Sequence, residues 1–504
     1  MKKALLSVYD KTDIVILAKE LILLGYELFS TGGTQTHLES HNIKVTPVEK
    51  LTEFPEIMDG RVKTLHPKIH GALLGIRNNE KHIDQASALG IEWINLLVVN
   101  LYPFRQTVLD PSSTEKDVIE HIDIGGPAMI RSAAKNWQDV GVVTDPSDYE
   151  HIIKELSKNQ MLSKETKRSL AGKAFRLTAQ YDTWVASYFT EELYPDTLNL
   201  TYQKVLDLRY GENPHQTAAL YEQTNKSPFG LLNAKKIHGK DLSYNNIKDA
   251  QAAYDLIGSF ESPTAVVIKH MNPCGISQGK TIEIAFIKAH HADPISIFGG
   301  IVAFNRTVTT ALAEQLSKLF LEVIMAPDYE DEALELLMQK KQVRLLTFDR
   351  ATAQNTHEMI SVSGGLLIQS SDNELYQTLS FPTIKQPNNE DIDELLFSYK
   401  VVKHMKSNAI ALTKAYCTVG LGVGQTSRIG AAVIAFDQAK DQAKEAYLAS
   451  DAFLPMADTV ELAARHGIKG IIQPGGSIKD QESIDLCNQH GLIMVFTHMR
   501  HFKH

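Results

Sequence analysis

The sequence predicts an α/β protein with at least two domains, and three observations support this expectation. Its 504 residues exceed what one hydrophobic core usually holds. Its composition, 43% hydrophobic and 22% charged, is that of a globular protein. Strand-like and helix-like segments alternate along the chain, which is typical of α/β layers with a mostly parallel sheet.

The N-terminal third shows this alternation most clearly. In its first helix, apolar residues recur every three or four positions, and Gly25 is placed to end the pattern. These apolar residues are Ile14, Leu17, Ala18 and Leu21. Strands are expected at residues 4–9, 26–30, 94–104 and 140–145, and helical segments at 12–25, 34–41 and 147–193.

Prolines and polar residues interrupt the helical pattern over residues 194–216, so we expect a domain boundary near residue 198. The predicted domains are residues 1–198 and 199–504, and the second is long enough for two subdomains. Helices are expected in it at residues 280–291, 308–320, 330–340, 390–405 and 457–467.

The charge and the cysteines narrow the class of function. A net charge of -9 gives no general attraction for nucleic acid, so anionic ligands such as small phosphorylated metabolites must be held by local clusters. The three cysteines lie far apart and form no disulfide framework. The first apolar run is too short for a signal peptide, and no run reaches the roughly 18 residues of a membrane span. We therefore expect a cytoplasmic protein with neither nucleic acid nor membrane as a partner.

Two N-terminal segments carry groups suited to a phosphate. Ser30–Thr34 follows a strand and precedes a helix, where backbone N–H groups and the helix N-terminus attract anions, although a Gly-Gly pair is more often a simple turn. Gly60–Pro67 groups Arg61 and Lys63 with Thr64, although the same cluster also suits a solvated basic loop.

Two further segments carry groups able to move protons. Tyr102 ends an apolar strand, where α/β sheets place ligand contacts, although a tyrosine there also suits the core. Asp123 precedes a Gly-Gly turn and Lys135 lies on the helix that follows; the alternatives are a helix cap and a surface lysine. Together the four segments offer more than a purely structural domain requires.

In this order and spacing, the motifs resemble the inosine monophosphate (IMP) cyclohydrolase domain of a bifunctional purine-biosynthesis enzyme family. The motifs are SVYDKT, STGGT, GRVKTLHP, NLYPF, IDIGG and AAKN. The resemblance implies a methylglyoxal-synthase-like fold with a parallel sheet. It implies that ring closure uses Lys63, Tyr102, Asp123 and Lys135. It implies that the nucleotide, largely its phosphate, is held by Ser7, Lys11, Thr31, Gly32, Arg61 and Thr64.

The stretch VVIKHMNPCG, residues 266–275, allows three interpretations. Pro273-Cys274 matches the start of the Pro-Cys-x-x-Cys turn of zinc deaminases, but the second cysteine is absent, so no metal is expected. Lys269 and His270 at the end of a strand can serve as acid–base groups if the backbone turns both toward one cleft. The third interpretation is a solvated basic strand end beside a satisfied histidine.

The motifs around this stretch resemble the AICAR (aminoimidazole-carboxamide ribonucleotide) formyltransferase half of the same family, so that the resemblance covers nearly the whole chain. They are LRYGENPH, SIFGG, KSNA, GQTSR, DAFLP, QPGGS and HMRHFKH. SIFGG is expected to end a strand and KSNA to open one. The resemblance implies a duplicated cytidine-deaminase-like α/β unit without the metal, and a homodimer whose transferase sites form across the subunit interface.

The resemblance also implies roles for individual residues. His270 would be the general base, and Lys269 and Asn408 would position and polarise the reacting groups, with 10-formyltetrahydrofolate as the formyl donor. The implied nucleotide contacts are Arg209, Tyr210, Phe298, Glu322 and Arg500, and the implied folate contacts are Phe453, Pro455 and Asp458. His504 matches the family's terminal histidine, whereas composition alone suggests a frayed basic tail.

The sequence therefore predicts an enzyme that converts AICAR into IMP through formyl-AICAR. Formyl transfer is expected in the C-terminal part and cyclisation with loss of water in the N-terminal domain. Two alternatives remain from the residues alone, a zinc-dependent deaminase and a nucleotide-binding regulatory module. Bound stoichiometric zinc would favour the first, and binding without turnover by residues 1–198 would favour the second.

Overall fold

The computed structural model describes residues 2–190, 192–224, 230–349 and 357–504, and the chain divides into two compact units, Met1–Thr201 and Tyr202–His504. Both units combine strands with helices, which confirms the predicted α/β class. Within the described ranges, no helix has both the length and the apolar character needed to cross a membrane.

The first unit is built on a five-stranded sheet in which every pairing is parallel, as predicted. The order of the strands is β3-β2-β1-β4-β5. Their bounds are β1 (Lys2–Ser7), β2 (Tyr26–Ser30), β3 (Thr46–Pro47), β4 (Leu96–Val99) and β5 (Gly141–Val143). The chain leaves β1 toward β2 on one side and returns to β4 on the other, so the topology switches between β1 and β4. Ligands of such sheets bind at the carboxyl ends of the strands beside that point.

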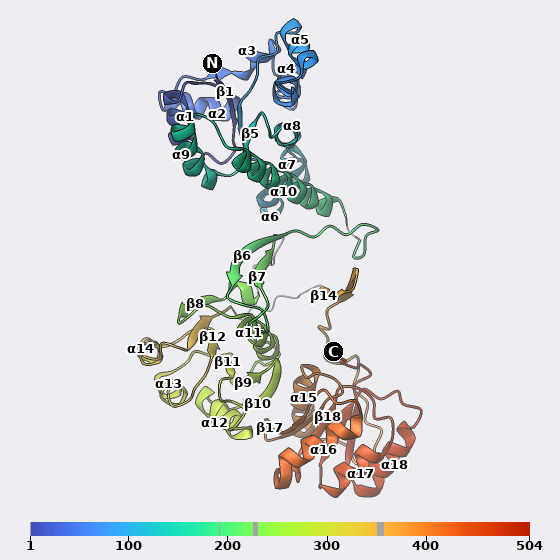
Figure 1. The fold of residues 1–504 in the computed structure, drawn as a ribbon. Coiled ribbons are helices and arrows are strands. Elements are labelled where there is room, and N and C mark those ends of the chain that lie inside the picture. Colours follow the sequence, from blue (N-terminus) through green and yellow to red (C-terminus); the bar gives the residue numbers. More distant parts are fainter. Residues whose placement is uncertain (1, 191, 225–229, 350–356) are drawn as a thin grey trace. The chain divides into compact units, whose positions relative to one another are not determined.

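Helices cover both faces of this sheet (Figure 1). On one face lie α1 (Ile14–Leu23) and α9 (Tyr149–Asn159), and on the other α4 (Pro67–Leu74), α8 (Gly125–Lys135) and α10 (Lys164–Phe189). The remaining helices are α2 (Gly32–Ser40), α3 (Val48–Thr52), α5 (Glu80–Ala88), α6 (Phe104–Leu109), α7 (Glu115–Glu120) and the 3-10 turn η1 (Pro146–Asp148). The four apolar positions predicted for the first helix are buried in α1.

The helical region expected at residues 147–193 is interrupted. Gln160 has φ 60° and ends α9 in the left-handed region. Ser163 then caps α10, because its hydroxyl accepts the Thr166 N–H at 3.1 Å. A polar cap followed by helix-forming residues thus starts a second helix where periodicity alone suggested continuity.

The second unit contains an eleven-stranded sheet made of two halves with the same topology. In each half a hairpin is followed by a strand antiparallel to the hairpin's first strand and then by two parallel strands. The halves join through the antiparallel pair β10 and β17. The first half is β9 (Thr264–Lys269), β10 (Asn272–Gln278), β11 (Ile301–Phe304), β12 (Val323–Ala326) and β13 (Arg344–Thr347), and the second is β16 (Ile410–Lys414), β17 (Cys417–Gly422), β18 (Tyr447–Ser450), β19 (Gly470–Gln473) and β20 (Ile493–Phe496). The duplicated α/β unit implied by the resemblance is confirmed.

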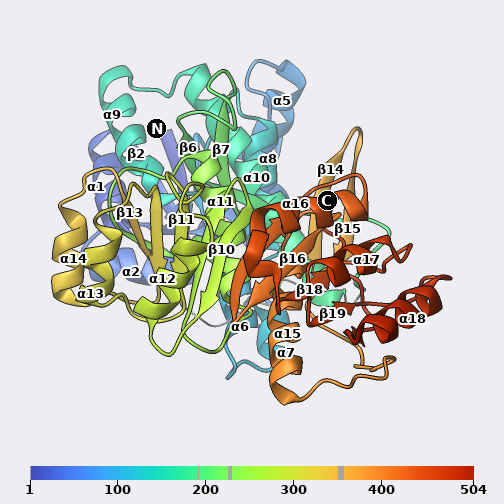
Figure 2. The same ribbon diagram turned by 90° about the horizontal axis from the view of Figure 1, so that it is seen from below.

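The helices follow the same duplication, and Figure 2 shows α12–α14 beside the first half and α16–α18 beside the second. The first set is α11 (Tyr244–Ile257), α12 (Ile282–Ala292), α13 (Thr310–Leu316) and α14 (Asp331–Met338). The second is α15 (Asn389–Lys403), α16 (Arg428–Ala439), α17 (Asp458–Arg465) and α18 (Asp480–His490). All five helices predicted for this part of the chain are present.

Smaller elements complete the second unit. Two separate ribbons pair β6 (Tyr202–Leu208) with β7 (Ala218–Gln223), and β14 (His357–Val362) with β15 (Gly365–Ser370). The edge strand β8 (Lys235–His238) pairs with β13. The 3-10 turns are η2 (Leu231–Asn233) and η3 (Lys440–Ala443).

One expected strand is wrong. Ser296–Gly300 does not end a strand but forms a turn that precedes β11. The Asp293 carboxylate accepts the N–H groups of Ile295 and Ser296, at 3.2 and 2.9 Å, and so stabilises a turn. The short apolar run before the glycines therefore precedes a strand instead of forming one.

Candidate active sites

The first unit contains a cavity of about 650 Å³, a size that suits a small metabolite. It lies at the carboxyl ends of β1, β2 and β4 and at the N-termini of α2 and α8. Nine of the ten residues predicted for this domain line it: Ser7, Lys11, Thr31, Gly32, Arg61, Lys63, Thr64, Tyr102 and Asp123. The parallel sheet brings them together because its strands end at one edge.

Hydroxyl groups and cations converge at the N-terminus of α2. The hydroxyls of Ser7 and Thr31 lie 2.8 Å apart. Gly32, the first residue of the helix, has φ +34°, and the Lys63 Nζ lies 3.0 Å from where a Cβ would stand on it. Lys11 Nζ lies 4.0 Å from the same position on Gly33. Free backbone N–H groups, two ammonium groups and two hydroxyls thus surround a space suited to a phosphate.

Three carboxylates that sequence reasoning missed also line the cavity: Glu56, Asp59 and Glu120. Glu56 pairs with Lys63, and Glu120 pairs with Arg61, whose Nε lies 3.2 Å from a Glu120 oxygen. A bound phosphate would compete with these carboxylates for the same cations. No sequence motif marks Glu56 or Glu120. The only signal that could have suggested them is that cations such as Arg61 and Lys63 usually have a counter-ion nearby.

Asp123 is both a helix cap and a buried carboxyl group. Its Oδ1 accepts the Gly126 N–H at 2.8 Å, and its own N–H donates to the Tyr181 hydroxyl at 2.7 Å. Burial raises the pKa of Asp123, while the N–H groups of Gly126 and Tyr102 act in the opposite direction. The capping role and the chemical role therefore do not exclude each other, and burial favours a carboxyl group that holds its proton more tightly than usual.

Tyr102 is half-exposed and lines the cavity, so it is not a core aromatic. Its ring stands edge-on to Tyr9 at 5.5 Å and to His121 at 6.3 Å. Lys135, by contrast, is exposed at the last turn of α8 and does not line this cavity. Ten residues separate it from Gly125 at the start of that helix, which corresponds to about 15 Å along the axis.

Asp123→Asn is expected to stabilise the first unit more at pH 7 than at pH 4. The pKa of this carboxyl group is raised in the folded state, so its contribution to stability is present below the unfolded value of about 3.9 and is lost as the pH rises through the folded value. The amide carries no such penalty and still accepts the Gly126 N–H. We expect a higher Tm at pH 7, by about 2–4 °C for each kcal/mol gained.

Thermal unfolding of both proteins at the two pH values measures this effect. The difference in Tm between variant and wild type should shrink at pH 4, because the carboxyl group is only about half ionised in the unfolded chain near its pKa of about 3.9 and little of the ionisation penalty remains. An equal difference at both pH values would show that ionisation of Asp123 is not its cause.

In the second unit, Lys269 and His270 stand at the β9–β10 hairpin. Lys269 is the last residue of β9, and its Nζ donates to the Phe298 carbonyl at 2.5 Å. It lies on the face of the sheet that carries Val267, whereas the exposed His270 belongs to a turn held by Asp249 of α11, on the opposite face. The hairpin thus delivers both residues to one end of the sheet, with the Lys269 side chain on one face and the His270 turn held from the other.

Asn408 lies at the same end of the sheet. Its Oδ1 accepts a hydrogen bond from Arg428 at 2.8 Å, and its Nδ2 donates to the Gln425 carbonyl at 2.9 Å. Arg428 forms an ion pair with Asp451, and both side chains are buried. Loss of either partner of a buried ion pair strongly destabilises a protein, so Arg428 is held firmly in the interior. Because Arg428 also binds the Asn408 amide, this interior network orients Asn408.

Asn272 links Asn408 to the histidine turn. Its Nδ2 donates to the His270 carbonyl at 3.1 Å, and its Oδ1 accepts the Lys406 N–H at 3.4 Å. Lys406 stands two residues before Asn408 in the segment that opens β16. The structure therefore joins the Lys-His and Lys-Ser-Asn-Ala motifs, which lie more than a hundred residues apart in the sequence.

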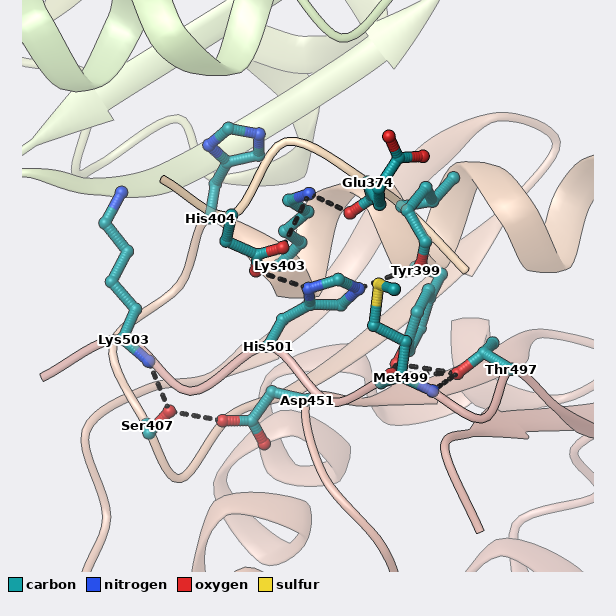
Figure 3. A network of polar contacts seen from close by, with 12 residues as sticks. Glu374, Tyr399, Lys403, His404, Ser407, Asp451, Thr497, Met499, His501 and Lys503 are labelled. Carbon is teal, nitrogen blue, oxygen red and sulfur yellow. Dashed lines mark hydrogen bonds and ion pairs between the residues drawn. The ribbon is translucent and has the colours of Figure 1, made fainter. Parts of the chain in front are cut away.

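The C-terminal segment, residues 499–504, is docked beside Ser407, the residue before Asn408 (Figure 3). His501 is 1% exposed, and its ring nitrogens bond to Asp372 at 2.5 Å and to the Leu375 carbonyl at 2.9 Å. Tyr399 donates to the Met499 carbonyl and stands edge-on to His501 at 5.1 Å. The C-terminal segment is therefore held in place by specific contacts and is not the frayed tail that composition suggested.

Ser407 connects this segment to the interior network. Its N–H donates to the Lys503 carbonyl at 2.9 Å, its hydroxyl accepts the Lys503 N–H at 3.0 Å, and the same hydroxyl donates to Asp451 at 2.5 Å (Figure 3). Lys406 Nζ donates to the His504 carbonyl at 2.5 Å. The last residues of the chain and the residues flanking Asn408 therefore form one hydrogen-bonded unit.

The structure places the remaining predicted contacts on separate elements. Phe298 is 66% exposed, tilts against Phe320 at 5.1 Å and lies next to Lys269 through its carbonyl. Glu322 pairs with Arg344 at 2.6 Å. Exposed side chains carry the other predicted contacts apart from Tyr210, which is partly exposed; these residues are Arg209, Tyr210, Phe453, Pro455, Asp458 and Arg500.

Local contacts orient several of these side chains. The Arg209 guanidinium lies 5.8 Å from the Tyr210 ring, and that of Arg500 lies 4.8 Å from the Phe502 ring. Asp458 begins α17 and accepts the Thr459 N–H at 2.7 Å. Because β6 and β7, the start of α17 and the C-terminal segment belong to different parts of the sequence, no local pattern predicts where these side chains lie relative to one another.

Cys274 lies within strand β10 and not in a turn. Its Sγ is 3.7 Å from the Val267 carbonyl, and burial raises the pKa of its thiol to about 12. Across the described parts of both units, no three His, Cys, Asp or Glu side chains are grouped so as to hold a metal ion. Cys274 therefore has the environment of a packing residue.

Comparisons with known proteins cover the whole chain. The family model described as AICARFT/IMPCHase bienzyme matches residues 133–438, and the MGS-like domain matches residues 13–128. Relatives named bifunctional purine biosynthesis protein PurH are 54% identical in Oceanobacillus iheyensis, 52% in Lysinibacillus sphaericus and 50% in Acetivibrio thermocellus. In each case the match covers 100% of this chain and 100% of the relative.

Proposed function

Because the chain belongs to the AICARFT/IMPCHase bienzyme family of purine biosynthesis, we propose that its first unit closes the IMP ring and its second unit transfers the formyl group. The predicted pair of activities is confirmed: the chain is an AICAR formyltransferase and IMP cyclohydrolase. Membership of this family decides against both alternatives, the zinc-dependent deaminase and the regulatory module.

The cavity of the first unit is the observation that carries the assignment of cyclisation. In this reaction a carboxamide nitrogen attacks a formyl carbon of the same molecule, so catalysis consists largely of holding a folded conformer. The phosphate would occupy the N-terminus of α2 beside Ser7, Lys11, Thr31 and Arg61. It would anchor the nucleotide with its reacting groups toward the α8 end of the cavity.

Three side chains in the cavity suit the chemical step. Lys63 and Tyr102 would stabilise the oxyanion that develops on the attacked formyl group. Asp123 would donate and accept protons as water leaves, a role for which its raised pKa suits it. The geometry of the first unit lends no comparable support to Lys135.

Formyl transfer would take place at the end of the second sheet where the His270 turn meets Asn408. The 5-amine of AICAR is a poor nucleophile because its lone pair is delocalised toward the carboxamide. His270 would remove the amine proton during attack on 10-formyltetrahydrofolate, and Lys269 and Asn408 would polarise the formyl oxygen. The orientation of Asn408 by Arg428 and Gln425 supports this assignment.

We further propose a homodimer in which each transferase site is completed by the partner subunit. The proposed nucleotide contacts Arg209, Tyr210, Phe298, Glu322 and Arg500 and the proposed folate contacts Phe453, Pro455 and Asp458 lie on separate elements of one unit. The β6–β7 ribbon, whose connecting segment carries Arg209, also exposes Tyr202, Val205 and Tyr221. Exposed apolar side chains on an isolated ribbon suit burial by a second copy of the chain. A cytoplasmic location accords with this metabolic role.

Gly126→Ala tests the assignment of cyclisation to the cavity. A Cβ at this position would stand 2.5 Å from a carboxylate oxygen of Asp123 and 2.8 Å from the Leu101 side chain, so Asp123 must move. Because displacement of about 1 Å can cost about 10²-fold in rate, we expect cyclisation of formyl-AICAR to fall by about that factor. Formyl transfer should keep its wild-type rate, measured by absorbance with AICAR and 10-formyltetrahydrofolate.

Gly172→Ala provides the matched control. Gly172 also lies in a helix, α10, but a Cβ there would meet only the flexible end of Arg176, at 3.5 Å. It should leave both activities unchanged and slightly raise stability, since alanine favours a helix more than glycine does. Equal cyclisation by both variants would contradict the proposed position of Asp123 in the reaction.

A further inference from the structure

The turn that carries His270 has a strained backbone. Lys269 pairs with Asn272 across the β9–β10 hairpin, so His270 and Met271 are the two turn residues. Their φ angles are 51° and 64°. Such turns normally contain Asn-Gly or Asp-Gly, because a larger residue in the left-handed region costs about 1–2 kcal/mol. Other contacts must therefore stabilise this turn.

Asp249 of α11 provides these contacts. Its Oδ1 accepts the Met271 N–H at 2.7 Å, and the His270 N–H also interacts with the carboxylate. Burial raises the pKa of Asp249, whereas the two turn N–H groups and the charges of His270 and Lys248 act in the opposite direction. The carboxylate is thus partly withdrawn from water, and its hydrogen-bond partners are the backbone N–H groups of the His270 turn.

The other side of the turn is anchored as well. Asn272 donates to the His270 carbonyl at 3.1 Å and accepts the Lys406 N–H at 3.4 Å. The backbone of His270 is therefore held from its N–H side by Asp249 and from its carbonyl side by Asn272. The residue His270 itself is exposed at this end of the sheet.

The second half of the sheet repeats this contact without a histidine. Ala415 and Tyr416 form the β16–β17 turn with φ 50° and 54°, and Glu394 of α15 accepts the Tyr416 N–H at 2.8 Å. Asp249 and Glu394 each lie six residues after the N-cap residue of their helix. Stabilisation of the hairpin by a carboxylate is therefore a property of the repeated unit. In the first half of the sheet, the carboxylate of Asp249 holds a turn that contains His270.

We propose that Asp249 is a positioning residue for formyl transfer, which fixes the backbone of His270 and thereby holds its imidazole in place for the reaction. The inference rests on the proposed role of His270 as general base. In that step the amine nitrogen bonds to the formyl carbon, and the bond between this carbon and N10 of the folate breaks. The proton that the imidazole takes from the amine passes to N10.

A double-mutant cycle with Asp249→Asn and His270→Ala tests the inference. Asp249→Asn should lower kcat of formyl transfer by about 10²-fold, as expected for a misplaced base, and should leave KM for AICAR unchanged. In the His270→Ala background the same substitution should cause no further loss, because Asp249 acts only through His270. Cyclisation of formyl-AICAR should be normal in all three proteins.

Glu394→Gln is the matched control, since it alters the equivalent contact in the other half of the sheet. It should lower the Tm of the second unit about as much as Asp249→Asn does, and it should keep the wild-type kcat. Asp249→Glu, which keeps the charge but lengthens the side chain, should retain an intermediate kcat. This variant also tests the inference if Asp249→Asn fails to fold.

Three results would overturn the inference: wild-type kcat in Asp249→Asn, an equal loss of kcat in Glu394→Gln, or a full additional loss in the double mutant. If His270→Ala itself kept full transferase activity, the proposed role of His270 would fail and this inference with it. An inactive His270→Ala beside a fully active Asp249→Asn would reject only the role of Asp249.

Discussion

His270→Ala is expected to lower the rate of formyl transfer by about 10²–10⁴-fold, the usual contribution of a general base. The amine of AICAR needs this base because its lone pair is delocalised. The same variant should cyclise supplied formyl-AICAR at the wild-type rate, because the cavity of the first unit contains no part of the β9–β10 hairpin. Absorbance assays of each half-reaction measure the two rates separately.

Lys63→Ala provides the reciprocal arm of this experiment. Lys63 lines the cavity of the first unit and approaches Gly32 at the N-terminus of α2. Its loss should suppress cyclisation, so that formyl-AICAR accumulates when AICAR and 10-formyltetrahydrofolate are supplied. If both activities fell together in either variant, the division of the reactions between the two units would be wrong.

A chain that ends at Met499 is expected to lose formyl transfer by at least about 10²-fold and to keep cyclisation. The missing residues include His501, whose ring bonds Asp372 and Leu375, and Lys503, whose backbone holds Ser407. Hydrogen bonds to charged groups contribute about 1.5–3 kcal/mol each, so Ser407 and the adjacent Asn408 should lose their fixed position.

Two measurements separate this effect from simple unfolding of the second unit. Thermal unfolding should show a lower Tm for the second unit and an unchanged one for the first. His501→Ala in the full-length chain should reproduce part of the loss, because it removes the buried ring and keeps the Lys503 backbone contacts with Ser407. Full transferase activity in the shortened chain would refute a role for the C-terminal segment.

Much of the local structure was predictable from residue patterns. The burial of Ile14 and Leu17, the end of α1 shortly before Gly25 and the five predicted helices of the second unit follow from periodicity and from turn residues, which act over a few positions. The exceptions also have local causes. Asp293 turns the chain where a strand was expected, and Ser163 starts a new helix inside a region that looked continuous.

The cavity of the first unit was also largely predictable, because its residues lie at the carboxyl ends of parallel strands. Once β1, β2 and β4 are recognised, Ser7, Thr31 and Tyr102 must meet at one edge of the sheet. The carboxylates Glu56 and Glu120 were missed because counter-ions need no particular spacing. Lys135 was placed by motif alone, and the length of α8 separates it from the cavity.

The sequence by itself determined the α/β class, most of the helices, the absence of the second metal-binding cysteine and the motifs that identify both activities. These are local properties, encoded by residues near one another in the chain. Only the tertiary structure showed that Asn272 joins the His270 turn to the Asn408 segment, that Ser407 binds the last residues of the chain and that Asp249 and Glu394 occupy equivalent positions. These contacts join residues from distant parts of the chain, and strand order and the duplication of the sheet decide which of them meet.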